Sequence, residues 1–191
     1  MTTTFAAAAA GLFLIRLVLF AALHLVRSDY NLVEHAVSDY AVGPTRRLSS
    51  AMTWVTAAGW ACLAVAVWSS DWDNHASVGV WLAILAVLFV ALPIVPTDLE
   101  GARRTTIGRL HYLLAIAWFA ISYTLTGTFH DHLHNTALNV LRWVAVISLA
   151  ALVIALAVRP LRPKFFGISE RVFILAINLF YLIAAAMLIS G

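Results

Sequence analysis

Six long apolar segments dominate the chain and restrict what it can fold into. Each contains about 20 mainly apolar residues, the length that an α-helix needs to cross the hydrocarbon core of a bilayer. They cover Phe5–Val26, Ser49–Trp68, Ser77–Val95, Ile107–Thr126, Thr136–Val158 and Ile168–Ser190. The connections between them leave no room for a soluble domain. The sequence therefore predicts a single domain over residues 1–191, an all-α bundle of six transmembrane helices.

Composition agrees with a protein that lies in the membrane. Hydrophobic residues make up 63% of the 191 residues and charged residues 11%, whereas a soluble domain has about 45–50% apolar and about 25% charged residues. The net charge of +3 comes from a few scattered basic residues, so we expect no nucleic-acid partner. The single cysteine, Cys62, excludes an internal disulfide. These numbers exclude a soluble enzyme, a disordered tail and a disulfide-rich scaffold.

The basic residues indicate how the helices are oriented. Of the 12 Lys and Arg residues, all except Arg16 and Arg142 lie in the first, third and fifth connections or at their edges. The positive-inside rule places such connections in the cytoplasm, so both chain termini are expected outside. Because Arg greatly outnumbers Lys and Ala is abundant, we expect a multi-pass protein of a bacterial cytoplasmic membrane, surrounded by lipid.

The first connection carries an amphipathic pattern. Asn31 and Glu34 have the spacing of a capping box. The residues that follow place apolar side chains on one helical face and polar ones on the other, up to Gly43 and Pro44. This pattern predicts one short amphipathic helix in or under the inner membrane interface.

Polar side chains from three segments are expected at one depth on the cytoplasmic side. They are His24, Asp29, His35, Ser38, Asp39, Asp98 and His111. The candidate catalytic residues among them are Ser38, Asp39, Asp98 and His111, because carboxylates and imidazoles act as general acids and bases and a serine acts as a nucleophile. His24 is a candidate ligand-binding residue. A divalent metal ion, or a haem held by His24 and His111, remains open, as does a structural role in capping helices and pairing with loop arginines.

Two further residues are candidates for ligand binding inside the bundle. Arg16 lies about 16 Å into the first segment, near the membrane midplane, where a charge is costly and by default faces the bundle interior. Asn178 in the sixth segment lies at a similar depth and is expected to hydrogen-bond it. We expect no carboxylate from the spans to pair with Arg16. Either the pair lines a polar cavity for an anionic or lipidic ligand, or it is a structural hydrogen bond.

A second group of histidines is expected on the outer side. It comprises His75 and the segment His130-Asp131-His132-Leu133-His134. If that segment is helical, His130 and His134 share a face and are able to bind a metal ion. The alternative is a solvated polar connection.

The polar motifs of the first and third connections resemble those of a known family. The residues concerned are His24, Asp29, His35-Ala-Val-Ser38-Asp39-Tyr40-Ala-Val-Gly43, Pro96-Thr97-Asp98 and Gly108-Arg-Leu-His111. This pattern resembles the prokaryotic six-span membrane family known as domain of unknown function 998, which is distantly similar to the Frag1/DRAM/Sfk1 group. The resemblance implies the fold and topology and no established reaction.

Three functions therefore remain open from the sequence. The first is an enzyme that acts on lipid or another membrane-dissolved substrate, and the second is a non-enzymatic binder or transporter of lipid or a small molecule. The third is a structural membrane protein without chemistry. The sequence names no cofactor.

Overall fold

Helices account for most of the computed structural model, which describes residues 1–26, 30–99 and 102–190. These residues form six α-helices: α1 (Thr2–Leu25), α2 (Arg46–Trp68), α3 (His75–Ala91), α4 (Thr106–Leu133), α5 (Thr136–Ala157) and α6 (Arg162–Ser190). Three short 3₁₀ helices lie in the connections: η1 (Val37–Ala41), η2 (Gly43–Thr45) and η3 (Arg159–Leu161). The all-α architecture predicted from the apolar segments is confirmed.

Helix ends follow from local side-chain chemistry. The Thr105 hydroxyl accepts a hydrogen bond from the Gly108 amide at the start of α4 (3.0 Å), and the Asn135 side chain accepts from the Ala137 amide at the start of α5 (2.8 Å). Side-chain acceptors at this position satisfy amides that have no partner within the helix. Between the two helices, His134 is left-handed with φ 45°, a conformation that ends a helix.

The helices are long enough to cross a membrane. Five segments meet the length and hydropathy expected of a span. The remaining helix, α3, has 17 residues, and at about 1.5 Å per residue it extends about 26 Å, near the lower limit for a span. It ends before the predicted Val95 because the backbone turns at Leu92 and Pro93, and helices usually end before a proline.

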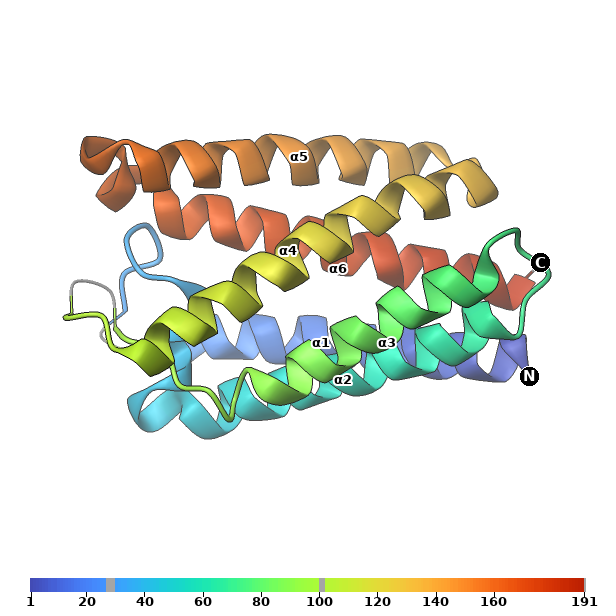
Figure 1. Cartoon of the computed structure of the whole chain (residues 1–191), viewed down its shortest axis with the longest axis horizontal. Coiled ribbons are helices and arrows are strands. Elements are labelled where there is room, and N and C mark those ends of the chain that lie inside the picture. Colours follow the sequence, from blue (N-terminus) through green and yellow to red (C-terminus); the bar gives the residue numbers. More distant parts are fainter. Residues whose placement is uncertain (27–29, 100–101, 191) are drawn as a thin grey trace.

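The helices form two groups that pack together through α1 and α6, and one oblique helix crosses between them. α1 packs against α2 and α6, α3 packs against α2, and α5 packs against α6. α4 runs diagonally between the group of α1, α2 and α3 and the pair α5 and α6 (Figure 1). The two termini lie at one end of the bundle, and the connection that contains η1 and η2 lies at the other (Figure 1).

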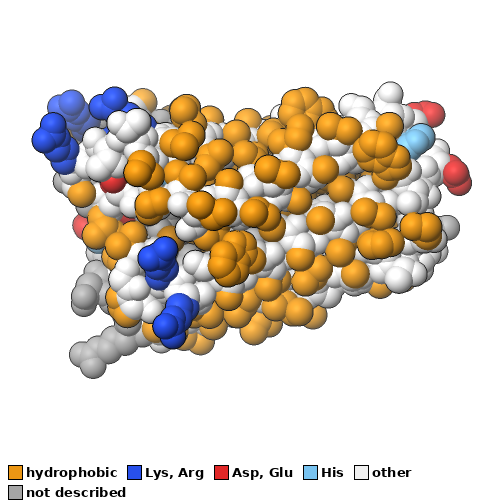
Figure 2. Space-filling view, turned by 60° about the horizontal axis from the view of Figure 1, so that its bottom comes forward, with side chains coloured by type: hydrophobic (Ala, Val, Ile, Leu, Met, Phe, Trp, Pro, Cys, Tyr) orange, Lys and Arg blue, Asp and Glu red, His pale blue; other side chains and the backbone are white. Residues whose placement is uncertain are grey.

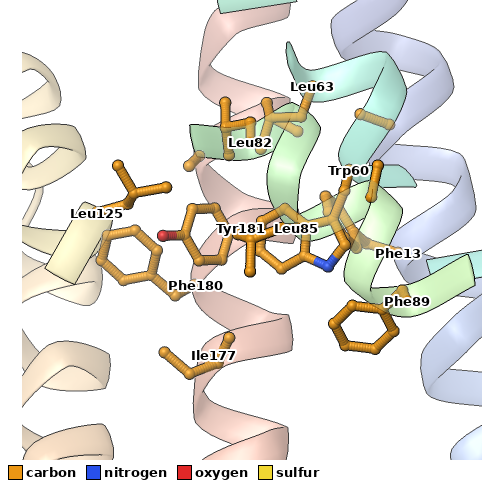
Figure 3. Packing of buried hydrophobic residues seen from close by; sticks show 14 of the residues in the cluster. Phe13, Trp60, Leu63, Leu82, Leu85, Phe89, Leu125, Ile177, Phe180 and Tyr181 are labelled. Carbon is orange, nitrogen blue, oxygen red and sulfur yellow. The ribbon is translucent and has the colours of Figure 1, made fainter. Parts of the chain in front are cut away.

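Aromatic rings pack in the middle of the bundle. The Trp60 ring meets the rings of Phe13 and Tyr181 edge to face, with centroid distances of 5.1 and 4.6 Å, and Figure 3 shows the three rings from three helices in contact. The Tyr181 hydroxyl donates to the Ser122 carbonyl (2.6 Å). Among the described residues, Trp60 Nε1 has no hydrogen-bond partner. The large rings nevertheless pack densely, and this layer closes the interior between the two ends.

The surface has the charge distribution of an integral membrane protein. Large apolar side chains such as Val18, Val87 and Ile147 are well exposed around the bundle. Figure 2 shows a broad apolar band, with Lys and Arg at one end and acidic and histidine side chains at the other. An exposed apolar surface of this extent is stable only against lipid.

Two local predictions need correction. The first connection does not form one amphipathic helix: Asn31 starts a single turn, in which its side chain accepts from the Val33 amide (2.8 Å), and the chain then forms η1 and η2. Hydrogen bonds to α6, described below, hold this turn in place of further helical bonds. The predicted Ile107–Thr126 segment is also too short, because α4 continues through the polar residues up to Leu133.

Candidate ligand-binding site

Two adjoining cavities lie in the half of the bundle that carries the basic connections. The first, which we call the inner cavity, lies among α1, α2, α3, α4 and α6 and has a volume of about 80 Å³. The second, the α4–α5 groove, has a volume of about 280 Å³ and a mainly apolar lining. Both are lined by Ser38, His111, Ala115 and Glu170. We call Ser38, His111 and Glu170 the polar junction, because the two cavities meet there.

The oblique course of α4 accounts for the groove. α4 and α5 are joined directly at one end by His134 and Asn135, and they separate toward the other end (Figure 1). At the rim, the side chains of Ile116 and Val153 are 61% and 57% exposed. The groove therefore opens sideways onto the lipid-facing surface.

His111 is the buried imidazole of the polar junction. Its side chain is 5% exposed, and its Nδ1 lies 2.7 Å from the Val95 carbonyl oxygen. A carbonyl only accepts, so Nδ1 carries the proton and Nε2 is an acceptor. Among the described residues, no hydrogen bond to Nε2 is present. His111 is therefore held in one tautomer with an available acceptor in the lining of both cavities.

Three residues near the start of α6 hold the first connection in place. The Gly167 amide donates to the Val33 carbonyl (2.8 Å). Glu170 Oε2 accepts from the Val37 amide (2.6 Å), and Arg171 Nη1 donates to the His35 carbonyl (2.7 Å). These bonds hold the stretch directly before Ser38 against α6, and Ser38 lines both cavities.

His24 has a structural role in this arrangement. Its Nδ1 donates to the Phe20 carbonyl (2.6 Å), and its Nε2 accepts from Arg171 Nε (2.9 Å). Both ring nitrogens are thus occupied, which leaves neither for a metal ion or a haem iron. His24 lies close to the first connection through its ring contact with Tyr40 (5.4 Å), and it does not line the two cavities.

The two candidate aspartates bind backbone amides. Asp39 Oδ2 accepts from the Ala36 amide (3.1 Å) at the start of η1. Asp98 accepts from the Thr105 amide (2.6 Å) and the Thr105 hydroxyl (2.9 Å) at the start of α4. A Cβ at Gly108 would overlap the Asp98 carboxylate, so glycine permits this approach. Neither aspartate is among the described residues that line the cavities.

Arg16 and Asn178 meet as expected. Arg16 lines the inner cavity with its side chain 5% exposed, and its Nη1 donates to Asn178 Oδ1 (2.7 Å). Asn178 Nδ2 in turn donates to the Phe13 carbonyl (3.1 Å), which fixes the orientation of the amide. The predicted hydrogen bond and the predicted interior position of Arg16 are confirmed.

Sequence reasoning missed Glu170. We expected no carboxylate within the spans, and this was wrong, because Glu170 lies in α6 and lines the same inner cavity as Arg16. The available signal was an acidic residue inside the sixth apolar segment, since ionisable residues there are functional candidates by default. Asp29, also named from the sequence, lies outside the described residues.

The outer histidines are spread over separate contacts. His130 lies 3.4 Å from Asp131, His132 stacks on Trp72 with a centroid distance of 4.5 Å, and His75 Nδ1 donates to the Trp72 carbonyl (2.9 Å). Within the described part of the chain, no three His, Cys, Asp or Glu side chains are grouped so as to hold a metal ion.

Comparison with known proteins gives a family and no activity. No curated protein and no solved structure matches the chain. One family model, described as a protein of unknown function (DUF998), matches residues 7–187. That match covers nearly all six helices and both cavities, and the chain therefore belongs to the DUF998 family.

Proposed function

We propose that the protein binds a membrane-dissolved amphiphile, a lipid or a lipid-like small molecule, in the α4–α5 groove. The observation that carries the proposal is the contrast along this groove. Its walls are apolar and open to the lipid-facing surface, and its inner end is the polar junction. A ligand site typically combines an apolar lining with a few convergent polar groups.

The chemistry of the lining indicates how such a ligand binds. Leu152, Val153 and Phe166 provide apolar contact for an alkyl chain, while His111 Nε2 accepts a hydrogen bond from a hydroxyl or amide of the polar end. The Ser38 hydroxyl is able to donate or accept. If the basic connections face the cytoplasm, the ligand enters from the cytoplasmic leaflet.

Filling the groove tests this proposal. Ile116→Trp places a larger side chain at the rim of the groove, whereas Ile147→Trp makes the same change on α5 at an exposed position that does not line it. Native mass spectrometry of the full chain, extracted in a mild detergent, then measures the lipid retained. We expect Ile116→Trp to retain severalfold less lipid and Ile147→Trp to match the wild type. Equal retention by all three proteins contradicts the proposal.

Acid–base chemistry on the bound amphiphile is a second candidate. The fixed tautomer of His111 favours it, because Nε2 is a ready proton acceptor and Ser38 lines the same two cavities. Incubation with defined lipids adds a second readout to the same experiment. If the protein is an enzyme, a converted lipid appears with the wild type and is absent with Ser38→Ala. A binder returns the lipid intact from both proteins.

A further inference from the structure

The inner cavity contains a buried cation with unused hydrogen-bonding capacity. Arg16 is 5% exposed, and its Nε has no hydrogen-bond partner. Among the described residues, no carboxylate forms an ion pair with it. A buried charge is costly unless it is paired, and a guanidinium carries five donors. An unpaired arginine that lines a cavity is thus a site for a negatively charged group.

The surroundings of Arg16 are suited to an anion. Asn178 Oδ1 accepts from Nη1 (2.7 Å) and fixes the position of the guanidinium without neutralising it. Ser49, Ser50 and Thr53 of α2 place hydroxyl-bearing side chains in the same lining. The cavity volume of about 80 Å³ is several times the roughly 10–15 Å³ that a single water requires, which leaves room for one carboxylate or phosphate group.

Of the described residues in this lining, one is acidic, and it lies toward the other end of the cavity. Glu170 precedes Asn178 by eight residues on α6, or about 12 Å along the helix axis. Its Oε2 accepts from the Val37 amide in the first connection (2.6 Å). The Arg16 guanidinium bonds to Asn178 and therefore lies near that level of the bundle, away from the Glu170 carboxylate.

From these observations we propose that the inner cavity is an oxyanion site, in which the Arg16 guanidinium binds a carboxylate or phosphate group. The aromatic layer of Phe13, Trp60 and Tyr181 lies beyond Arg16, so the anion reaches it from the polar junction. A free anion and the acidic end of an amphiphile share this chemistry. The inference does not depend on occupation of the α4–α5 groove.

Equilibrium dialysis of the full chain in phosphatidylcholine nanodiscs tests the site. The probes are inorganic phosphate, dodecyl phosphate, dodecanoate and the neutral dodecanol. We expect at least one anionic probe to bind about tenfold more tightly than dodecanol, because hydrogen bonds to charged groups are the strong ones. Phosphate that binds as tightly as dodecyl phosphate identifies a free anion, and a preference for the alkyl anions identifies an acidic amphiphile.

Two variants and two controls show whether Arg16 is responsible. Arg16→Met removes the cation. Asn178→Asp keeps the side-chain size and supplies a carboxylate that neutralises the Arg16 guanidinium. The second variant therefore remains informative if the first does not fold. Both should lose the anion preference and keep the binding of dodecanol. Arg142→Met and Arg103→Met, which alter arginines outside the cavity lining, should keep the preference. The inference is overturned if the wild type shows no anion preference or if Arg16→Met and Asn178→Asp retain it.

Discussion

At the scale of single residues, Arg171 connects the most parts of the candidate site. Its Nε donates to His24 of α1, and its Nη1 donates to the carbonyls of His35 and Gly167. The planar guanidinium makes these bonds together because its donors are held in a fixed fork. One side chain of α6 thus ties α1 to the connection that carries Ser38.

Arg171→Lys should therefore destabilise the protein although it keeps the charge. An ammonium group cannot reach the same three acceptors in one geometry, and each lost hydrogen bond to a charged group is worth about 1.5–3 kcal/mol. Thermal unfolding of Arg171→Lys in detergent should show a clearly lower midpoint than that of the wild type. A cysteine probe at position 38 (Ser38→Cys in a Cys62→Ser background) should react faster with a maleimide when Arg171→Lys is also present than when Arg171 is intact. Arg103→Lys, at an exposed position, is the control. Equal midpoints for Arg171→Lys and the wild type would show that these contacts do not support the fold.

At the scale of elements, the close approach between α6 and the first connection shapes the polar junction. A Cβ at Gly167 would lie 2.6 Å from the carbonyl oxygens of Leu32 and His35, distances that real side chains do not adopt. The glycine lets the backbone of the connection lie directly on the helix.

Gly167→Ala should displace the first connection from α6. We expect a lower unfolding midpoint and weaker lipid retention, because Ser38 moves with the backbone that the new methyl group pushes away. The matched control is Gly11→Ala in α1, where a Cβ meets nothing within 4 Å and alanine stabilises a helix by up to about 1 kcal/mol relative to glycine. If both substitutions have the same effect, the helix propensity of alanine accounts for the result and the contact does not.

At the scale of the whole molecule, the charge distribution predicts an orientation in the membrane. The basic connections lie at one end of the bundle and both termini at the other. An even number of crossings, six in this bundle, places both termini on the same side of the membrane, whichever side that is. From the positive-inside rule we expect the basic end to face the cytoplasm.

Cysteine labelling in intact cells tests the orientation. In a Cys62→Ser background, Asp73→Cys lies between α2 and α3, and Arg103→Cys lies between α3 and α4. A membrane-impermeant maleimide should label position 73 from outside and position 103 only after permeabilisation. The reverse pattern would invert the topology, and labelling of both positions from outside would contradict a bundle in which these connections lie on opposite sides.

The sequence alone determined the features that depend on local composition. Six apolar runs gave six helices whose ends were within a few residues for α2 and α5, because span length is a property of consecutive residues. The interior position of Arg16 and its bond to Asn178 also followed from the sequence, since a charge near the midplane has few tolerable places. The function did not follow from the sequence: the polar motifs fit several functions, and the family that matches is described as of unknown function.

Only the tertiary structure decided which polar groups meet. His24 was expected to bind a ligand, but its Nε2 accepts a hydrogen bond from Arg171. Glu170 was not among the candidates, but it lines the inner cavity. In a membrane helix, apolar residues face both the lipid and the neighbouring helices, so hydropathy does not reveal which face packs inward. The first connection likewise lost its predicted helix because its amides and carbonyls bond to α6. These features depend on how helices cross and rotate, and the oblique course of α4, which opens the groove, is a property of packing that no local pattern encodes.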